Sequence, residues 1–130
     1  MPLKCIIVTP EQTVDERTAD FVALPLYDGE LGVAPGHTPM IGRLGYGELR
    51  IVEGGVTTRY FVDGGFAEVA DNVVSVLTNN AVPAGKVDST KAQAQLEAAK
   101  ARPATTPELL AIRERDQLRA RAQIRVAAKK

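Results

Sequence analysis

The sequence predicts a mostly β protein in which an antiparallel β-sandwich or barrel is followed by two helices. Residues 1–80 consist of short, alternating apolar and polar runs separated only by turns, as is typical of antiparallel sheets. After Pro83-Ala84-Gly85-Lys86 the composition becomes rich in Ala, Gln and Lys, as in helices. Charge divides at the same place, with a net −6 in residues 1–85 and +6 in residues 86–130. We therefore expect a β domain over 1–85 and a helical hairpin over 86–130.

The expected strands are short and bounded by turns. Glu53-Gly54-Gly55 and Asp71-Asn72 have the composition of hairpin turns, whereas Asp63-Gly64-Gly65 predicts a sharper bend. Residues 28–40, called the ribbon below, contain three glycines and two prolines and predict a rigid, turn-locked segment. The strands themselves are expected over 4–9, 21–26, 40–44, 48–52, 56–62, 66–69 and 73–78.

Two helices are expected after residue 86. Asp88 is placed to cap a first helix over 89–101, and Thr106 to cap a second that begins at Pro107. Because alanine buries little apolar area, we expect the hairpin to be weakly anchored and to exchange between docked and released arrangements. Three residues share one face of the first helix: Ala92, Leu96 and Ala99. The second helix has an interrupted apolar stripe with Asp116 inside it, made of Leu109, Ile112, Ala120, Ile124 and Ala127.

The composition argues against several classes of function. One histidine, His37, and one cysteine, Cys5, allow no histidine-based metal cluster and no internal disulfide, and we expect Cys5 to be a small core residue. Gly45-Tyr46-Gly47 lacks the third glycine of a dinucleotide-binding fingerprint. The basic half has no aromatic residues to stack on bases, so an acidic protein surface is a better partner than nucleic acid.

Two further features bear on the location of the protein. No apolar run reaches the roughly 18 residues of a membrane-spanning helix. The N-terminus, Met1-Pro2-Leu3-Lys4, shows no apolar segment or cleavage site of a secretory signal. From these features we expect a soluble, intracellular protein.

Segments along nearly the whole chain resemble the epsilon subunit of F-type ATP synthases. The part of the ribbon from Gly29 to Pro39 resembles the family's Gly-Glu-(aromatic or Leu)-Gly-Ile-x-Pro-Gly-His-Ala-Pro. Gly47-Glu48-Leu49-Arg50-Ile51 resembles the Gly-x-(Ile or Leu)-(Arg or Lys)-(Ile or Val) that follows it. Residues 64–69 and 72–77 resemble its Gly-Gly-x-x-Glu-Val and Asn-x-Val-x-Val-Leu strands, and Gln123-Ile124-Arg125-Val126 resembles its closing Gln-Leu-Arg-Val.

The resemblance implies an N-terminal antiparallel β-sandwich of about ten strands, an antiparallel two-helix hairpin and no active site. It implies a non-catalytic rotor subunit of the central stalk, bound to the gamma subunit and to the c-subunit ring, which couples ion flow to rotation and ATP synthesis. It also implies a peripheral place on the cytoplasmic side of the bacterial plasma membrane, with contact to the membrane only through the complex.

The resemblance also assigns roles to residues. Glu30 corresponds to a residue that approaches the c ring, and His37 to one that lies near gamma, which agrees with a contact role for a histidine held between turns. The rest of the gamma-facing surface would be formed by Thr38, Pro39, Met40, Asp63 and Gly64. The family's hairpin can extend into the alpha/beta head, where basic residues meet the beta subunit and block hydrolysis. The matching arginines are Arg113, Arg115, Arg119, Arg121 and Arg125.

Some family members bind ATP on the folded hairpin through a segment resembling (Ile or Leu)-Asp-x-x-Arg-Ala. This chain has Asp88, Lys91 and Ala92 at the three specified positions. Lysine in place of arginine lacks the planar fork that binds phosphate through two nitrogens. We therefore expect no required cofactor and treat ATP only as a candidate regulatory ligand. The alternative function is a β-sandwich module that binds a nucleotide and switches its hairpin on its own.

Overall fold

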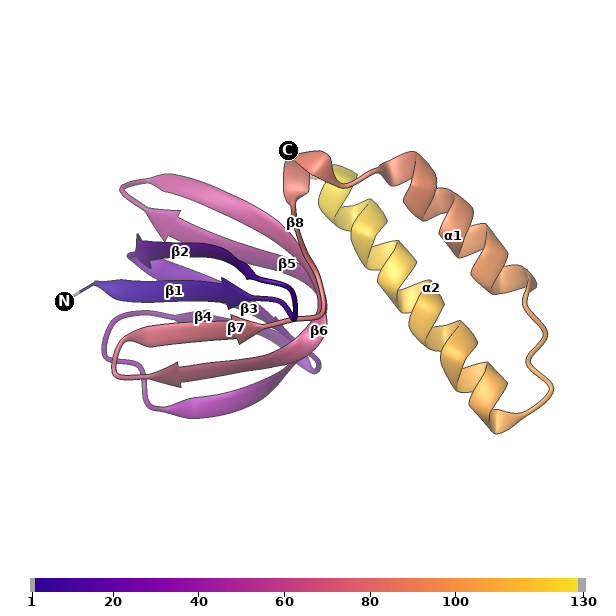
Figure 1. The fold of residues 1–130 in the computed structure, drawn as a ribbon, viewed down its shortest axis with the longest axis horizontal. Helices are drawn as coiled ribbons and strands as arrows, with labels where there is room; N and C mark the ends of the chain where they lie inside the picture. The colour runs from indigo at the N-terminus through magenta and orange to yellow at the C-terminus, as the bar shows by residue number, and fades with distance from the viewer. Residues whose placement is uncertain (1, 129–130) are drawn as a thin grey trace.

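A computed structural model describes residues 2–128 and places a β-sandwich beside a helical hairpin (Figure 1). The helical part comprises a short 3₁₀ turn η1 (Ala84–Lys86), α1 (Ser89–Ala101) and α2 (Pro107–Ala128). The eight strands are β1 (Leu3–Val8), β2 (Thr13–Ala19), β3 (Phe21–Leu26), β4 (Gly29–Val33), β5 (Met40–Glu53), β6 (Val56–Ala70), β7 (Val73–Leu77) and β8 (Ala81–Pro83).

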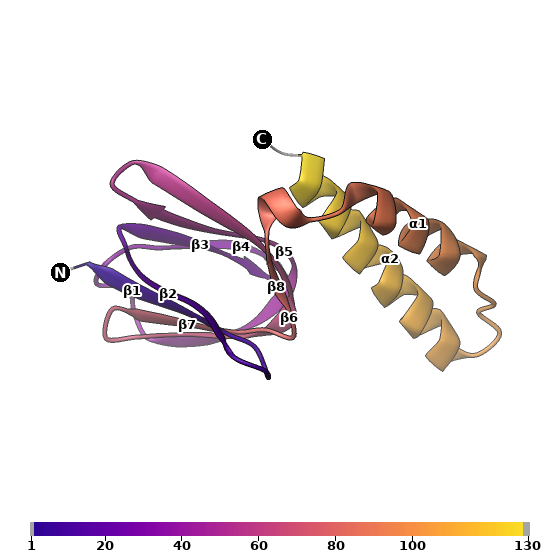
Figure 2. The ribbon, with the colours of Figure 1, turned by 45° about the horizontal axis from the view of Figure 1, so that its top comes forward.

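All eight strands belong to one sheet that folds over itself into two layers. The strand order is β2-β1-β7-β6-β5-β3-β4, and β8 pairs with β6. β5 and β6 are long enough to run through both layers: the end of β6 pairs with β7, whereas its beginning pairs with β8. Figure 2 shows the two layers from a second direction. The predicted β-sandwich followed by two helices is confirmed.

The crossing between the layers lies at the predicted bend. Gly64 and Gly65 have φ of +66° and +106°, conformations that L side chains rarely adopt. Both stay within β6, so the predicted strands 56–62 and 66–69 form one strand. The predicted strands 40–44 and 48–52 likewise merge into β5. The structure has eight strands within the described residues, where the resemblance implied about ten.

The sheet is mixed, which corrects the prediction of a purely antiparallel one. β1 lies between β2 and β7, and it pairs with β7 in parallel, with Lys4 beside Val73 and Val8 beside Leu77. The other pairings are antiparallel. Parallel neighbours must be joined by a long connection, and here most of the β domain lies between the two strands.

β2 was not predicted, because its sequence Thr-Val-Asp-Glu-Arg-Thr-Ala is largely polar. It is an edge strand, where charged residues are common because one side of the backbone faces solvent. Asp15 and Arg17 form an ion pair at 2.8 Å, and Tyr60 Oη donates a hydrogen bond to Asp15 at 2.8 Å. The hydrogen bond from Tyr60 on β6 joins the edge strand to the opposite layer.

The sandwich core lies between the two layers and is formed by alternating side chains of both. Cys5 belongs to it, as predicted, and is 1% exposed. Both hairpin turns are also confirmed: Gly54, Gly55, Asp71 and Asn72 all have positive φ. The largest fully buried aliphatic residues are Leu3, Ile7, Leu24, Leu44, Leu49 and Ile51.

The helical hairpin begins and ends where its capping residues predict. Asp88 Oδ1 accepts a hydrogen bond from Lys91 N at 3.0 Å, and Thr106 Oγ1 accepts one from Leu109 N at 3.1 Å. The predicted buried face of α1 is confirmed. In α2 the buried residues are Ala120, Ala122 and Val126. Leu109 and Ile112, at the start of the predicted apolar stripe, are 42% and 40% exposed, whereas Ala120 further along it is buried.

Candidate functional site

The ribbon starts as edge strand β4 and continues as a fixed turn. His37 N donates to Ala34 O at 3.2 Å, and Gly36, with φ of +83°, donates its N–H to Asn72 Oδ1 at 2.8 Å. His37 is half-buried, and its Nδ1 lies 2.7 Å from Thr38 O. The ribbon is thus held both by its own turn and by the β6–β7 turn. Because the ribbon is already held in place, binding a partner would cost little further conformational entropy.

The other predicted gamma-facing residues divide into two groups. Thr38 and Pro39 are exposed beside His37, and Met40 is half-buried against the sandwich core. Asp63 and Gly64 lie at the bend of β6, where Asp63 bonds to Arg119 of α2. The structure therefore places Asp63 under the hairpin.

Glu30 lies on β4 at one end of a line of alternating charges. Arg50 donates to both of its carboxylate oxygens, at 2.8 and 2.9 Å, which raises the pKa of the arginine. Glu48 accepts from Arg50 at 3.5 Å and from Arg59 Nε at 2.7 Å. Arg59 in turn donates to Val126 O, near the end of α2, at 3.0 Å. The predicted c-ring residue is thereby joined to the hairpin through side chains of β5 and β6.

The five predicted beta-subunit arginines are not equally available in this arrangement. Arg113 is half-buried and donates to Arg102 O at 3.5 Å. Arg119 bonds to Asp63. Arg115 is exposed and lies 3.4 Å from Asp116, and Arg121 and Arg125 are exposed.

Asp116 lies within the second helix because it joins the two helices. Its carboxylate forms an ion pair with Arg102, the residue that ends α1. Asp116 is also 4.0 Å from Arg119. An acidic residue inside an otherwise apolar stripe is therefore explained by the ion pair that closes the hairpin.

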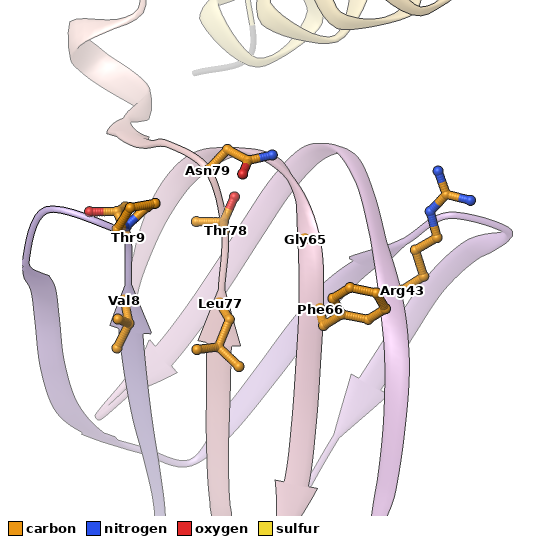
Figure 3. A pocket seen from close by; sticks show the side chains of 9 residues that line it. Val8, Thr9, Arg43, Gly65, Phe66, Leu77, Thr78 and Asn79 are labelled. Carbon is orange, nitrogen blue, oxygen red and sulfur yellow. The ribbon is translucent and has the colours of Figure 1, made fainter.

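An exposed apolar patch on the sandwich was not predicted. Ile41, Phe66 and Leu77, called the apolar face below, are 73%, 56% and 49% exposed. Phe66 is directly opposite Leu77 on β7 and Arg43 on β5, and Figure 3 shows these side chains in a row with Val8 of β1. A hollow of about 730 Å³ lies along this row. The signals in the sequence were two pairs of adjacent apolar residues, Phe66-Ala67 and Val76-Leu77. Each pair places apolar side chains on both faces of its strand.

The candidate ATP residues line a smaller hollow between the hairpin and the sandwich. Its volume is about 280 Å³, and Asp88, Lys91 and Ala92 border it together with Phe61 and Gln123. The Asp88 carboxylate already accepts the Lys91 N–H at the start of α1. The N-terminus of that helix therefore already carries a negative group, as capping requires.

The titratable groups inside the sandwich are held in their neutral forms. Burial, helped by the Asp15 carboxylate, raises the pKa of the Cys5 thiol to about 12. Burial and the hydrogen bond to Asp15 raise the pKa of Tyr60 to about 12. A thiol in this state does not form the reactive thiolate at neutral pH. Within residues 2–128 no group of three metal-ligating side chains gathers, and neither helix is apolar enough over a sufficient length to cross a membrane.

Comparisons with known proteins agree with this architecture. A family model for the β-sandwich domain of the ATP synthase delta/epsilon chain matches residues 2–84. An ATP synthase epsilon chain from Rhodopirellula baltica is 51% identical over 127 residues, which cover 98% of this chain and 99% of that one. An epsilon chain from Prochlorococcus marinus is 43% identical over 100 residues, which cover 77% of this chain and 74% of that one.

Two solved structures have similar folds. A chain in the Euglena gracilis mitochondrial ATP synthase, in a structure of OSCP, F1 and the c-ring, matches with a TM-score of 0.86 at 25% identity and covers 98% of this chain and 82% of that one. A chain in the central stalk and c-ring of the Tetrahymena thermophila mitochondrial enzyme matches with a TM-score of 0.77, covering 98% and 97%, but at 13% identity it supports the fold alone. Because the family model spans more than half of the chain and the Rhodopirellula relative aligns along nearly all of it, this chain belongs to the family of ATP synthase epsilon chains.

Proposed function

We propose that this chain is a non-catalytic rotor subunit of the F1Fo ATP synthase that couples ion flow through the c ring to rotation and ATP synthesis, and that its hairpin restrains ATP hydrolysis. The β domain, 1–85, would bind gamma and the c ring, and the hairpin, 86–130, would regulate. As part of this complex, the chain would lie peripherally on the cytoplasmic side of the bacterial plasma membrane.

The observation that carries the coupling role is the apolar face beside the ribbon. Ile41 directly follows Met40, so the exposed apolar surface continues from the turn that holds His37, Thr38 and Pro39. Large exposed apolar side chains that lie together mark sites of protein association. This supports gamma as the partner of the face and of the ribbon turn. Glu30, on the sheet edge at the start of the ribbon, would meet the c ring.

Capture by purified gamma tests this docking role. Phe66→Ser should weaken gamma binding about tenfold or more, because a large aromatic residue at the centre of an interface often dominates the binding energy. Val56→Ser is the matched control, since Val56 is 67% exposed but lies at the start of β6, near the β5–β6 turn. His37→Ala and Glu30→Ala would separate the gamma contact from the c-ring contact. Equal capture of the Phe66→Ser and Val56→Ser chains would contradict the proposed face.

The regulatory role is supported by the basic surface of α2. Arg121 and Arg125 are exposed in the docked hairpin and could meet an acidic segment of the beta subunit once the hairpin extends. A chain with Arg121→Gln and Arg125→Gln should inhibit hydrolysis by the reconstituted enzyme less than the unchanged chain. Lys91→Gln with Lys100→Gln removes the same charge from α1 and serves as the control. If the chain with the two arginine changes and the chain with the two lysine changes inhibit hydrolysis equally, the second helix does not act through these arginines.

The alternative, a nucleotide-binding switch that acts alone, is favoured by the hollow between the hairpin and the sandwich. Lys86 and Lys91 border it, and Gln95 and Gln123 could bind polar groups of a nucleotide. Calorimetry of ATP with the isolated chain tests this candidate. Binding that Lys91→Ala abolishes would support it, whereas no heat at millimolar ATP would rule it out.

A further inference from the structure

Arg119 of α2 contacts the sheet at a pair of cross-strand neighbours, Tyr46 on β5 and Asp63 on β6. Its Nε donates to Asp63 Oδ1 at 3.0 Å, and its guanidinium carbon lies 5.5 Å from the centre of the Tyr46 ring. Tyr46 and Asp63 are directly opposite each other in the β5–β6 register, so both side chains project from one face of the sheet. A guanidinium binds a carboxylate through an ion pair and an aromatic ring through a cation–π contact.

The sheet holds Asp63 rigidly. Its N–H lies 3.0 Å from Thr78 Oγ1 and 3.1 Å from Asn80 O, and its carbonyl accepts from Asn79 Nδ2 at 3.1 Å. The bend at Gly64 follows at once. The Asp63 side chain is 16% exposed, so its carboxylate is largely shielded from solvent. A carboxylate carried on a backbone fixed in this way loses little further freedom when it binds a cation.

The other contacts that hold the hairpin on the sheet, among the described residues, are a small apolar cluster and a hydrogen bond. The apolar cluster between them consists of Phe61, Ala84, Ala122 and Val126. At about 25 cal/mol per Å², the two alanines contribute little, so Phe61 and Val126, with Tyr46 and Val87 packed against them, supply most of this contact. A further polar contact between α2 and the sheet in this region is the hydrogen bond from Arg59 to Val126 O. The Arg119 contact is therefore a substantial part of the docking interaction.

We propose that Tyr46 and Asp63 form a guanidinium clamp that holds the hairpin docked by binding Arg119. The effect of the clamp on ATP hydrolysis rests on the proposed function. The resemblance assigns Arg119 to the contact with the beta subunit and Asp63 to the contact with gamma. Neither side chain can make that contact while the two bind each other. Loss of the clamp would shift the hairpin toward release and strengthen the restraint on hydrolysis.

The test uses the full chain carrying Ala122→Cys and measures the rate at which a thiol reagent modifies it. Ala122 is 1% exposed and packs in the cluster between α2 and the sheet, so the reagent reaches the introduced thiol only when α2 moves away. The rate therefore reports even a small released population. The native Cys5, also 1% exposed, lies in the sandwich core, and its rate reports unfolding of the sandwich.

Asp63→Asn and Arg119→Gln should each raise the rate at the introduced thiol about tenfold, since each removes a charge-assisted hydrogen bond, without raising the rate at Cys5. The two changes together should add little to either alone, because they break one contact. Tyr46→Leu should give a smaller increase and Tyr46→Phe, which keeps the ring, should give none. Glu68→Gln, which neutralises an exposed carboxylate elsewhere on β6, is the matched control.

The clamp would be refuted if the Asp63→Asn and Arg119→Gln chains were modified at the same rate as the Glu68→Gln control. It would also be refuted if the two rate increases added in the double variant. Arg119→Gln lies on the helix and leaves the sandwich unaltered, so the test holds even if Asp63→Asn disturbs the bend. Hydrolysis by the reconstituted enzyme, measured with the Tyr46→Leu chain, separates the clamp from the function, because Tyr46 belongs to the clamp but is not assigned to gamma or to the beta subunit. Faster modification with unchanged hydrolysis would refute the restraint and support the clamp.

Discussion

The sandwich and the hairpin bury very different kinds of side chain. The sandwich core contains large aliphatic residues, such as Leu49 and Ile51, that are at most 1% exposed. Most buried positions of the hairpin are alanines, and Leu96 is the largest side chain among those described there. Because the stabilisation from burial grows with apolar area, the sandwich is held by its core and the hairpin by much less.

Polar contacts take a larger share in the hairpin. The ion pair of Arg102 with Asp116 closes it, and Arg119 joins it to Asp63 on the sheet. An ion pair can be exchanged for one with another protein, whereas an apolar core cannot open without exposing its whole area to water. The comparison therefore suggests one permanent part and one part that can change partners. Four predictions test it, in order of decreasing effect.

The largest effect should come from Gly65→Ala, at the crossing between the two layers. A Cβ there would lie 1.9 Å from Leu77 O, and φ is +106°. We expect a loss of more than about 4 kcal/mol of unfolding free energy, measured by urea denaturation. Gly55→Ala is the control: φ is +80°, but nothing lies within 4 Å of its Cβ, so only about 1 kcal/mol should be lost. Similar losses in both chains would show that the crossing is not tightly packed.

Truncation of one leucine in each region compares the two cores directly. Leu49→Ala should cost about 3 kcal/mol of unfolding free energy because the sandwich cannot close around the cavity. Leu96→Ala should leave the urea midpoint of the sandwich nearly unchanged and raise amide exchange in the hairpin. If Leu96→Ala destabilises the sandwich as much as Leu49→Ala, the two regions unfold as one unit and the comparison fails.

High pH should weaken the sandwich core. The pKa values of Cys5 and Tyr60 are raised from 9.0 and 10.0 to about 12 in the folded chain, so folding favours their protonated forms. Their contribution is fully present below pH 9 and is lost as the pH rises toward 12. Between pH 8 and pH 11 we expect a loss of about 4 kcal/mol of unfolding free energy, the larger part of it from Cys5. The loss should shrink in Cys5→Ala; an identical loss in that chain would rule out the thiol as its source.

The smallest effect should come from the helix cap. Asp88→Ala removes the acceptor for Lys91 N and should cost α1 about 1 kcal/mol. Amide exchange in the first turn of α1 should speed up about fivefold, with no change in the sandwich. Asp88→Ser, which can still cap, should behave like the unchanged chain. Faster exchange in the sandwich of the Asp88→Ala chain would contradict the independence of the two regions.

Short-range patterns predicted much of this fold. The turns at Gly54-Gly55 and Asp71-Asn72, and the caps Asp88 and Thr106, depend on residues within four positions of each other, so the sequence contains all that decides them. β2 escaped prediction because its charges serve contacts with distant strands. The exposure of Leu109 could not be read from the sequence, because a helical stripe does not tell which part of a long helix reaches another element.

The sequence by itself determined that a turn-rich β domain precedes a weakly anchored, basic hairpin, since local conformation and side-chain character follow from neighbouring residues. Only the tertiary structure decided that β1 runs parallel to β7, that the apolar face is exposed beside the ribbon, and that Asp63 and Arg119, 56 residues apart, bind each other. The physical reason is that pairing between distant segments depends on how the whole chain closes, and no local preference encodes it.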